Sequence, residues 1–274
     1  MRVATRDHLL GSLLSCAVDP SITLEQLRGL YLDLMRDCLT GMIYDDPPLE
    51  WKAEGVRPFD RGTREIGMDW PARAHSMIGQ KRMLQLQRAA EFVIEREIPG
   101  DFIETGVWRG GACILLRSVL KAHGVTDRRV WLADSFEGLP APDPEHYPAD
   151  RDDTLYTYPA LAVPLETVRD NFARYGLLDD QVVFLKGWFR DTLAAAPIDR
   201  LAILRLDGDL YESTIQALTA LYDKVSVGGF VIVDDYGVFP NCRAAITDFR
   251  QSRGIRGRMH DVDGTAVFWQ SGVE

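Results

Sequence analysis

Four aspartates stand in two pairs whose spacing could support metal-assisted chemistry. Asp207 and Asp209 close the apolar run LAILRL, and Asp234 and Asp235 close the run GGFVIV that follows one helix-length later. If the two runs are neighbouring parallel strands, both pairs meet at the same edge of the sheet. Four carboxylates at such close range repel one another and need a counter-charge, of which the simplest is a divalent cation.

The ligand types narrow the choice of that cation. Every candidate ligand is an oxygen atom, with no Cys or His beside the pairs, which favours Mg²⁺ and leaves Mn²⁺ or Ca²⁺ as alternatives. A metal there could lower the pKa of a bound substrate hydroxyl, and a carboxylate not fully used in coordination could accept the proton. The plainer alternative is that Asp209 caps a helix beginning near Tyr211 and that Asp235 begins a turn.

A glycine-rich turn follows the strand expected over residues 102–107. Gly106, Gly110 and Gly111 are spaced G-x-x-x-G-G, which differs from the G-x-G-x-x-G fingerprint that seats a pyrophosphate. Glu104, just before the turn, would repel a pyrophosphate and favour an ammonium group. A cofactor with an amino-acid head and no phosphate fits this turn, which indicates S-adenosylmethionine.

The next two strand ends extend the predicted cofactor site. The second strand ends in LADSFEG, where Asp134 could accept hydrogen bonds from both ribose hydroxyls. After the third strand comes FLKGWFRDTL, where Gly187 and Trp188 would lie beside the adenine. Strand-ending aspartates often cap helices, so each feature alone is weak, whereas the ordered series on three successive strand ends is specific.

Alternating apolar and helical patterns predict the elements that position these residues. We expect strands over residues 102–107, 129–134, 182–186, 201–207, 229–235 and 265–269. We expect helices over residues 111–122, 165–175, 211–224 and 241–253. This alternation is typical of an α/β fold with a doubly wound, mostly parallel sheet, in which ligands bind at the carboxyl ends of the strands.

The N-terminal part of the chain predicts helices and a cover for the site. Residues 1–40 read as helical, with Thr23 as an N-cap, and a second helix is expected over residues 79–97. Between them, residues 40–75 are rich in Pro and aromatic side chains, which suggests a lid. Residues 137–164 form an insertion that is either a second substrate cover or an ordinary surface loop. We therefore expect a helical lid region over 1–98 and a catalytic domain over 99–274.

Composition limits the partners and the compartment. The chain has 274 residues, of which 46% are hydrophobic and 26% charged, and its formal net charge of -10 disfavours nucleic acid. Its four cysteines form no CxxC pair, which favours a reducing compartment. We see no signal peptide and no apolar run of membrane-spanning length, so we expect a cytoplasmic protein whose partners are small molecules rather than membranes.

Five stretches resemble the macrocin-type O-methyltransferases of antibiotic biosynthesis, the family that contains the novobiocin and mycinamicin tailoring enzymes. These stretches are DWPARAHSMIG, DFIETGVWRGGA, LADSFEGLP, LRLDGDLYEST and GGFVIVDDYG. The resemblance implies a Rossmann-like class I methyltransferase fold with an N-terminal helical lid, magnesium dependence, and methylation of a sugar or phenolic hydroxyl of a natural product. It also implies a homodimer or a larger homo-oligomer.

The resemblance also assigns roles to residues. It makes Asp209 the general base and Asp207 its catalytic neighbour, with His75 or His146 as alternative bases. The metal ligands would be Asp207, Asp234 and Asp235. Together with the strand-end analysis, it gives a cofactor site of Ser76, Met77, Ile78, Gly79, Glu104, Gly106, Gly110, Asp134, Ser135, Gly187, Trp188 and Asp207.

Two other classes of function can be weighed against a methyltransferase. The D-G-D stretch at Asp207 imitates the D-x-D metal motif of sugar-nucleotide glycosyltransferases, although that hypothesis leaves the turn at Glu104 without a role. A non-catalytic binding protein on the same scaffold would require a broken cofactor or metal motif, and none is broken. Titration with nucleotide-sugars against S-adenosylmethionine would separate the first two hypotheses.

Overall fold

The fold is organised around one seven-stranded sheet. The computed structural model describes residues 22–49 and 57–273, so residues 1–21 of the region predicted as helical over 1–40 and the aromatic Trp51 lie outside the described residues. The strand order is β3-β2-β1-β4-β5-β7-β6, parallel from β3 to β5, with β7 antiparallel to both neighbours. The strands are β1 Asp101–Thr105, β2 Val130–Asp134, β3 Val182–Lys186, β4 Leu201–Leu206, β5 Val225–Val233, β6 His260–Asp261 and β7 Val267–Gln270. The predicted α/β doubly wound sheet is confirmed.

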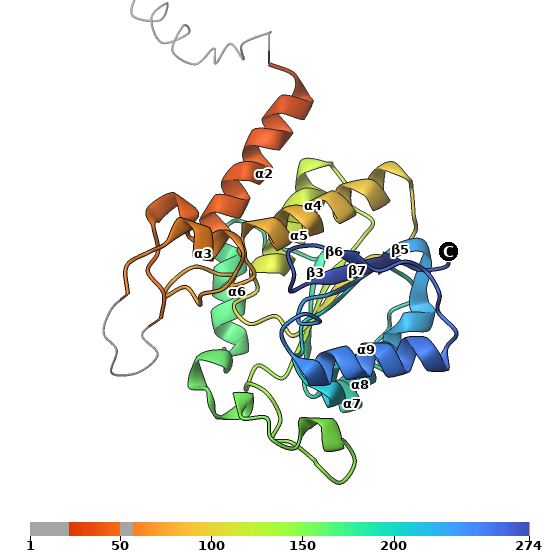
Figure 1. Cartoon of the computed structure of the whole chain (residues 1–274). Coiled ribbons are helices and arrows are strands. Elements are labelled where there is room, and N and C mark those ends of the chain that lie inside the picture. Colours follow the sequence, from red (N-terminus) through yellow and green to blue (C-terminus); the bar gives the residue numbers. More distant parts are fainter. Residues whose placement is uncertain (1–21, 50–56, 274) are drawn as a thin grey trace, which may run out of the picture.

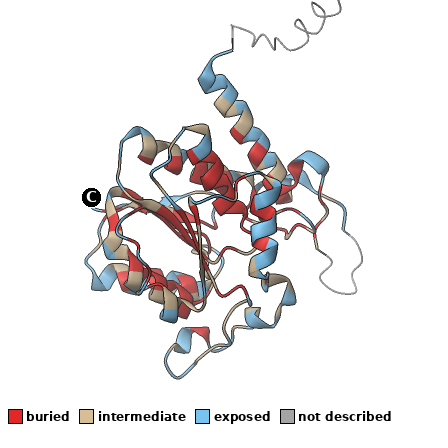
Figure 2. Ribbon diagram, turned by 180° about the vertical axis from the view of Figure 1, so that it is seen from behind, coloured by how far each residue is buried: buried red, intermediate tan, exposed pale blue. Residues whose placement is uncertain are grey.

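Helices cover both faces of the sheet (Figure 1). The α-helices of the described residues are α2 Leu24–Thr40, α3 Arg61–Glu65, α4 Gly79–Glu95, α5 Gly111–Ala122, α6 Leu165–Arg174, α7 Phe189–Thr192, α8 Tyr211–Leu221 and α9 Pro240–Ser252. One apolar cluster joins α2, α4, α5 and α6 to the sheet face that carries Phe102. A second cluster joins α8 and α9 to the face that carries Ile103, as expected for side chains that alternate along a strand. The buried residues accordingly concentrate in the sheet and the adjoining sides of the helices (Figure 2).

Most predicted elements are present, and their ends differ for local reasons. β1 ends at Thr105, two residues earlier than expected, because Gly106 turns the chain with φ of 88°. The predicted helix over 211–224 ends at Leu221 and continues as the 3-10 turn η5, Tyr222–Lys224. β5 begins at Val225, four residues before the predicted start. The short elements α7 and β6 were not predicted.

The described part of the N-terminal region contains more secondary structure than its irregular sequence suggested. α2 begins at a capping box in which the Thr23 side chain accepts a hydrogen bond from the Gln26 N–H, so the predicted N-cap is confirmed. The segment predicted as an irregular lid contains the 3-10 turn η1, Met42–Tyr44, and α3. Within it, the fully buried Arg64 pairs with Asp69 and donates to the carbonyl oxygens of Thr40 and Asp46. That it opens and closes as a lid stays a prediction.

The insertion forms three short 3-10 turns below the sheet edge (Figure 1). They are η2 Pro148–Asp150, η3 Leu155–Thr157 and η4 Pro159–Leu161. None of the helices in the described part of the chain has the length and apolar character needed to span a membrane.

Candidate active site

A cavity of about 280 Å³ lies at the carboxyl ends of the parallel strands. It gathers residues from the ends of β1 to β5, from the segment before α4 and from the insertion. The predicted site residues that line it are Ser76, Met77, Ile78, Glu104, Gly106, Asp134, Ser135, Gly187, Trp188, Asp207, Asp209, Asp234 and Asp235. These residues share one cavity because parallel strands bring their carboxyl ends together, and their roles toward a cofactor or a metal stay predictions.

Two predicted cofactor residues do not line the cavity. A side chain at Gly110 would meet Val168 at 2.8 Å, and one at Gly79 would meet the Gly67 backbone nitrogen at 2.4 Å. Both glycines have positive φ, 85° and 74°, so they serve the path and packing of the backbone.

Gly106 brings the two halves of the site together. A Cβ atom there would lie 1.8 Å from the carbonyl oxygen of Asp207, and its φ is 88°. The turn after β1 therefore packs directly on the end of β4, which only a residue without a side chain permits.

Asp134 holds the turn after β1 in place. Its carboxylate accepts hydrogen bonds from the backbone N–H of Val107 at 2.7 Å and of Phe136 at 2.6 Å. Burial raises the pKa of Asp134, against the lowering effect of these hydrogen bonds. This carboxylate thus organises the backbone around the cavity, and its predicted role toward the ribose stays a prediction.

Glu104 has a partner that the sequence analysis missed. Its side chain is only 2% exposed, and it accepts hydrogen bonds from the Arg205 guanidinium at 2.5 Å and the Cys113 thiol at 3.0 Å. Burial raises the pKa of Glu104 to about 7, and the positive charge of Arg205 opposes the shift. A carboxylate in this setting keeps a negative charge beside the turn only because an arginine is held against it.

Three of the four aspartates form a potential metal site. One carboxylate oxygen from each of Asp207, Asp234 and Asp235 lies within 4.8 Å of the others. Burial raises the pKa of Asp207 to about 6, although Arg205 opposes the shift. The pKa of Asp235 is raised well above its ordinary value by burial and by the negative charge of Asp209. All of these donor atoms are oxygens, which hard divalent cations prefer. The carboxylates also repel one another, and a bound cation would offset that repulsion.

Asp209 lies beside this trio in an unusual conformation. Its φ is 57°, and its backbone N–H donates to the Asp235 carboxylate at 3.3 Å. Burial and the charges of Asp207 and Asp234 raise its pKa well above the ordinary value. It does not cap α8: the first N–H groups of that helix are bound instead by Asp150 of the insertion, so the capping interpretation is wrong.

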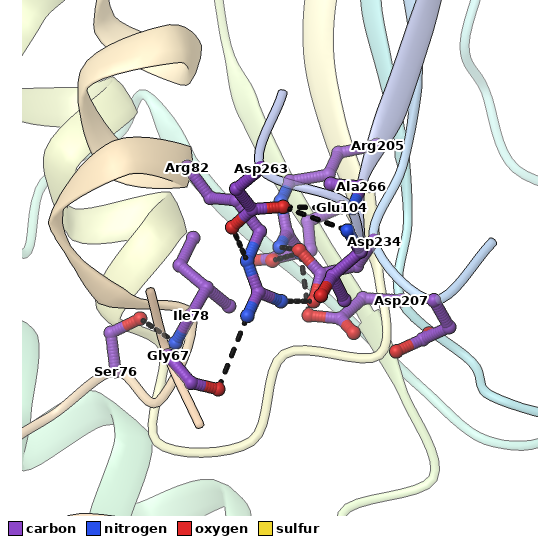
Figure 3. A network of polar contacts seen from close by, with 12 residues as sticks. Gly67, Ser76, Ile78, Arg82, Glu104, Arg205, Asp207, Asp234, Asp263 and Ala266 are labelled. Carbon is purple, nitrogen blue, oxygen red and sulfur yellow. Dashed lines mark hydrogen bonds and ion pairs between the residues drawn. The ribbon is translucent and has the colours of Figure 1, made fainter. Parts of the chain in front are cut away.

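Two buried arginines complete the site (Figure 3). Arg205 pairs with Glu104, with Asp207 at 2.6 Å and with one carboxylate oxygen of Asp234. Arg82 of α4 contacts the other Asp234 oxygen and pairs with Asp263 at 3.0 Å. Asp234 is thereby fixed in orientation, and the charge of the cluster is partly balanced.

Both arginines stand at positions in the sequence that indicate burial, which our sequence analysis did not use. Arg205 interrupts the apolar strand LAILRL, and Arg82 shares the buried face of α4 with Leu86. A charged side chain at a core position needs a buried partner, and the clustered aspartates were the available ones.

The two histidines are placed very differently. His75 lines the cavity, and its Nδ1 lies 2.8 Å from the Tyr175 hydroxyl. Burial and the charges of Arg174 and Arg109 lower the pKa of His75 to about 4. His146 is exposed and pairs with Asp143 of the insertion at 2.7 Å.

Both predicted cover segments contribute walls to the cavity. The segment before α4 supplies Met68 and Trp70, and the insertion supplies Leu155 and Leu161. The ring of Trp70 meets that of Tyr158 edge-on at 6.3 Å between centroids. The two segments therefore touch over the site, which the sequence did not reveal.

The sheet order and the site together define an S-adenosylmethionine-dependent class I methyltransferase fold of the α/β class. The model of the macrocin O-methyltransferase (TylF) family matches residues 28–271. The chain belongs to this family, so it is an O-methyltransferase. The family membership contradicts the glycosyltransferase and non-catalytic alternatives.

Named relatives cover nearly the whole chain. A tetracenomycin-type enzyme of Streptomyces olivaceus, 8-demethyl-8-(2,3-dimethoxy-alpha-L-rhamnosyl)-tetracenomycin-C 4'-O-methyltransferase, is 53% identical over 90% of this chain and 94% of its own. Demethyldecarbamoylnovobiocin O-methyltransferase of Streptomyces niveus is 51% identical over 88% of this chain and 93% of its own. The solved structure of the O-methyltransferase NovP superposes with a TM-score of 0.85 at 51% identity, covering 89% of this chain and 98% of its own.

Proposed function

We propose that this chain transfers the methyl group of S-adenosylmethionine to a sugar or phenolic hydroxyl of an antibiotic-type natural product, with the help of a divalent cation. The observation that carries the proposal is the convergence of Asp207, Asp234 and Asp235, whose carboxylate oxygens lie within 4.8 Å of one another. They line the same cavity as the glycine turn at Gly106 and the carboxylate of Asp134. One cavity thus offers a cofactor end and a cation end.

The cofactor end is proposed to bind S-adenosylmethionine along the ends of β1, β2 and β3. Glu104 and the stretch Ser76–Ile78 would face the methionine part, and Asp134 with Ser135 the ribose. Gly187 and Trp188 would border the adenine. All of these residues line the cavity, and the matched family and the fold support this choice of cofactor.

The cation end is proposed to hold Mg²⁺ through Asp207, Asp234 and Asp235. A bound cation would supply Lewis acidity, which lowers the pKa of an acceptor hydroxyl. Arg82 and Arg205 keep the Asp234 carboxylate in one orientation by contacting its two oxygens from opposite elements. Such outer partners commonly orient metal ligands.

Asp209 is proposed as the general base. It lines the cavity beside Asp207 and Asp235 and is not one of the three proposed metal ligands, so its carboxylate is left to accept a proton. Asp209 would take the proton of the acceptor hydroxyl, and bound S-adenosylmethionine would supply the methyl group to the hydroxyl oxygen, with S-adenosylhomocysteine as the other product. His75 is a weaker candidate, because its pKa of about 4 and its contact with Tyr175 suit a structural role.

A homodimer or larger homo-oligomer is part of the proposal. The support is the outer face of α2, where Leu24, Leu30 and Leu34 are between 50% and 70% exposed. Apolar faces of this kind are usually covered by another protein surface. Light scattering during size-exclusion chromatography measures the assembly, and a monomer would contradict this part.

The test combines binding with turnover. The purified chain should bind S-adenosylhomocysteine in calorimetry, and should methylate one of the two acceptors named for its relatives, demethyldecarbamoylnovobiocin or the rhamnosylated tetracenomycin. EDTA should abolish turnover and Mg²⁺ should restore it. Failure to bind S-adenosylhomocysteine would refute the cofactor assignment, and turnover that persists in EDTA would refute the metal assignment.

The variant Asp207→Asn separates the metal from the cofactor. It should lose the response to Mg²⁺ while it remains folded by circular dichroism. Glu137→Gln is a matched control, because Glu137 is exposed and pairs only with Lys186 at the surface. If both variants respond to Mg²⁺ like the unaltered chain, Asp207 is not a ligand.

A further inference from the structure

One carboxylate of the insertion is buried where its neighbours are exposed. Asp150 is 1% exposed, whereas Arg151 and Asp152, the next two residues, are exposed. A charged side chain leaves water at a cost of several kcal/mol or more unless hydrogen-bond donors replace it. The structure therefore has to supply donors to Asp150.

The donors come from two helices that lie far along the chain. The Asp150 carboxylate accepts hydrogen bonds from the backbone N–H groups of Tyr211 at 2.8 Å and Glu212 at 2.9 Å. It also accepts one from the Asn241 side-chain amide at 2.9 Å. Tyr211 and Glu212 begin α8, and Asn241 is the second residue of α9. One carboxylate thus binds the first turns of the two helices that follow the acidic ends of β4 and β5.

The start of α8 depends on this bond. Its N-cap residue, Leu210, has no side chain that could bind the free N–H groups of the first turn. In most helices a Ser, Thr, Asp or Asn at that position does so. Here Asp150 supplies the cap from a different segment, and its negative charge also suits the positive end of the helix dipole.

The capped turn is the one that carries Asp209. Only Leu210 separates Asp209 from Tyr211, and the φ of Asp209, 57°, is costly for a residue with a side chain. Such a conformation persists only where neighbouring contacts fix it. Asp235 holds the N–H of Asp209 on one side, and Asp150 holds the N–H of Tyr211 on the other.

The backbone of Asp150 leads directly into the wall that the insertion builds. The carbonyl oxygen of Asp150 accepts a hydrogen bond from the Asp153 N–H at 2.9 Å, and the Asp153 carboxylate accepts one from the Leu155 N–H at 2.7 Å. Leu155 lines the cavity. At the far end of the insertion, the Trp108 indole donates to the Ala160 carbonyl oxygen at 2.8 Å. Asp150 and Trp108 therefore fasten the two sides of this wall.

We infer that Asp150 is a positioning residue, which clamps the insertion to the first turns of α8 and α9 and so holds Asp209 and the wall at Leu155 in one arrangement. The part that concerns Asp209 rests on the proposed function, in which Asp209 is the base. The clamp itself rests only on the three hydrogen bonds and the burial of Asp150.

Hydrogen–deuterium exchange of the full chain tests the clamp without any acceptor. Asp150→Asn keeps the shape but removes the charge and replaces one acceptor atom by a donor. Loss of a cap of this strength should speed exchange by about tenfold in two separate segments, 148–161 and 209–216. Exchange in α5 and the affinity for S-adenosylhomocysteine should stay within about twofold of the unaltered chain, since a cap contributes chiefly at its own helix end.

Asp143→Asn is the matched control. Asp143 belongs to the same insertion and also accepts backbone hydrogen bonds, from Glu145 and His146, but its side chain is 45% exposed and its bonds are local. It should leave segment 209–216 unchanged. Unchanged exchange of 209–216 in Asp150→Asn, an equal effect of Asp143→Asn, or uniform loosening of the whole chain would overturn the clamp.

Steady-state kinetics distinguish a positioning role of Asp150 from a merely structural one. With an acceptor that the wild-type chain methylates, Asp150→Asn should raise the acceptor KM and lower kcat while the KM for S-adenosylmethionine stays constant. An equal rise of both KM values would overturn the assignment of Asp150 to the acceptor side. If no acceptor is methylated, the proposed function fails, whereas the exchange experiment still decides the clamp.

Discussion

The two ends of the cavity are built in different ways. At the proposed cofactor end, backbone hydrogen bonds join neighbouring strand ends: the Gly106 N–H donates to the Ala133 carbonyl oxygen and the Gly187 N–H to that of Asp134. At the proposed cation end, side chains from distant segments converge. Arg82 comes from α4, Asp263 from the loop before β7, and Asp150 from the insertion. Local motifs specify the first end, and long-range packing specifies the second.

This difference predicts where substitutions act. A change at the cofactor end should alter cofactor affinity and leave the cation end in place. A change at the cation end should alter turnover or the packing of segments that are far apart in the sequence, while the cofactor still binds. The following predictions test this separation, beginning with the largest effect.

Asp209→Asn should have the largest effect on turnover. Loss of a positioned general base lowers the rate by about 10²- to 10⁴-fold, because the amide cannot accept the hydroxyl proton. S-adenosylhomocysteine affinity should remain unchanged in calorimetry, since Asp209 belongs to the other end of the cavity. Asp152→Asn is the control, because Asp152 is an exposed aspartate of the insertion with no assigned role in proton transfer or in the wall. Retention of more than a tenth of the activity would remove Asp209 as the base.

Arg82→Met should have the largest effect on stability. It removes the guanidinium that contacts Asp234 and Asp263 and leaves both buried carboxylates short of a partner. Breaking a buried pair in this way costs about 3–5 kcal/mol, which urea unfolding measures.

The control for Arg82→Met lies on the same helix. Arg88 of α4 is exposed, so Arg88→Met should change the free energy of unfolding by less than about 0.5 kcal/mol. Arg82 also donates to the carbonyl oxygens of Ile66 and Gly67, so its loss should expose the segment before α4 to protease. Equal stability of the two variants would show that the cation end does not depend on α4.

The fold could be predicted from the sequence because its signals are local. β4, buried at all six positions, reads as an apolar run in which Arg205 is the one charged residue, and α5 was predicted with its observed ends. The errors have physical causes. β6 has only two residues, and α7 only four, so neither is long enough to show a period.

The candidate site could be predicted only in part. The aspartates and the glycine turn stand at strand ends, and the parallel order of the strands alone brings them together. Asp150 has no such signal, because one Asp among many in a loop shows neither its burial nor its partners in α8 and α9. The opposition of Arg82 to Asp234 likewise depends on how α4 packs against the sheet. These placements result from tertiary packing, which the spacing of apolar residues along the sequence does not encode.

Asp134→Asn should have a moderate effect, confined to cofactor binding. The amide loses the charge and one acceptor atom, so at least one of the N–H groups of Val107 and Phe136 loses a good partner. A buried hydrogen bond to a charged group contributes about 1.5–3 kcal/mol, so the affinity for S-adenosylhomocysteine should fall by about tenfold or more. Calorimetry measures it, and kcat at saturating cofactor should stay within about threefold, because the cation end is untouched. The exposed Asp127→Asn should change neither quantity.

His75→Gln should have the smallest effect, visible only as a change in pH dependence. The segment before α4 places His75 at the cofactor end, where its carbonyl oxygen accepts the Gly111 N–H at 2.9 Å, so here too a remote segment contributes. In the folded chain the pKa of His75 is about 4, below the usual 6.5. Between these values the unfolded chain takes up a proton that the folded chain does not, so His75 makes stability fall as the pH falls from 6.5 to 4, with a slope of at most about 1.4 kcal/mol per pH unit. His75→Gln should reduce the pH dependence of the free energy of unfolding, measured with urea at several pH values in this window. His146→Gln, at the exposed histidine, should leave that dependence unchanged. An equal pH dependence of the free energy of unfolding in the two variants would show that His75 is not held neutral in the folded chain. The cofactor end would then depend only on the local motifs at its strand ends.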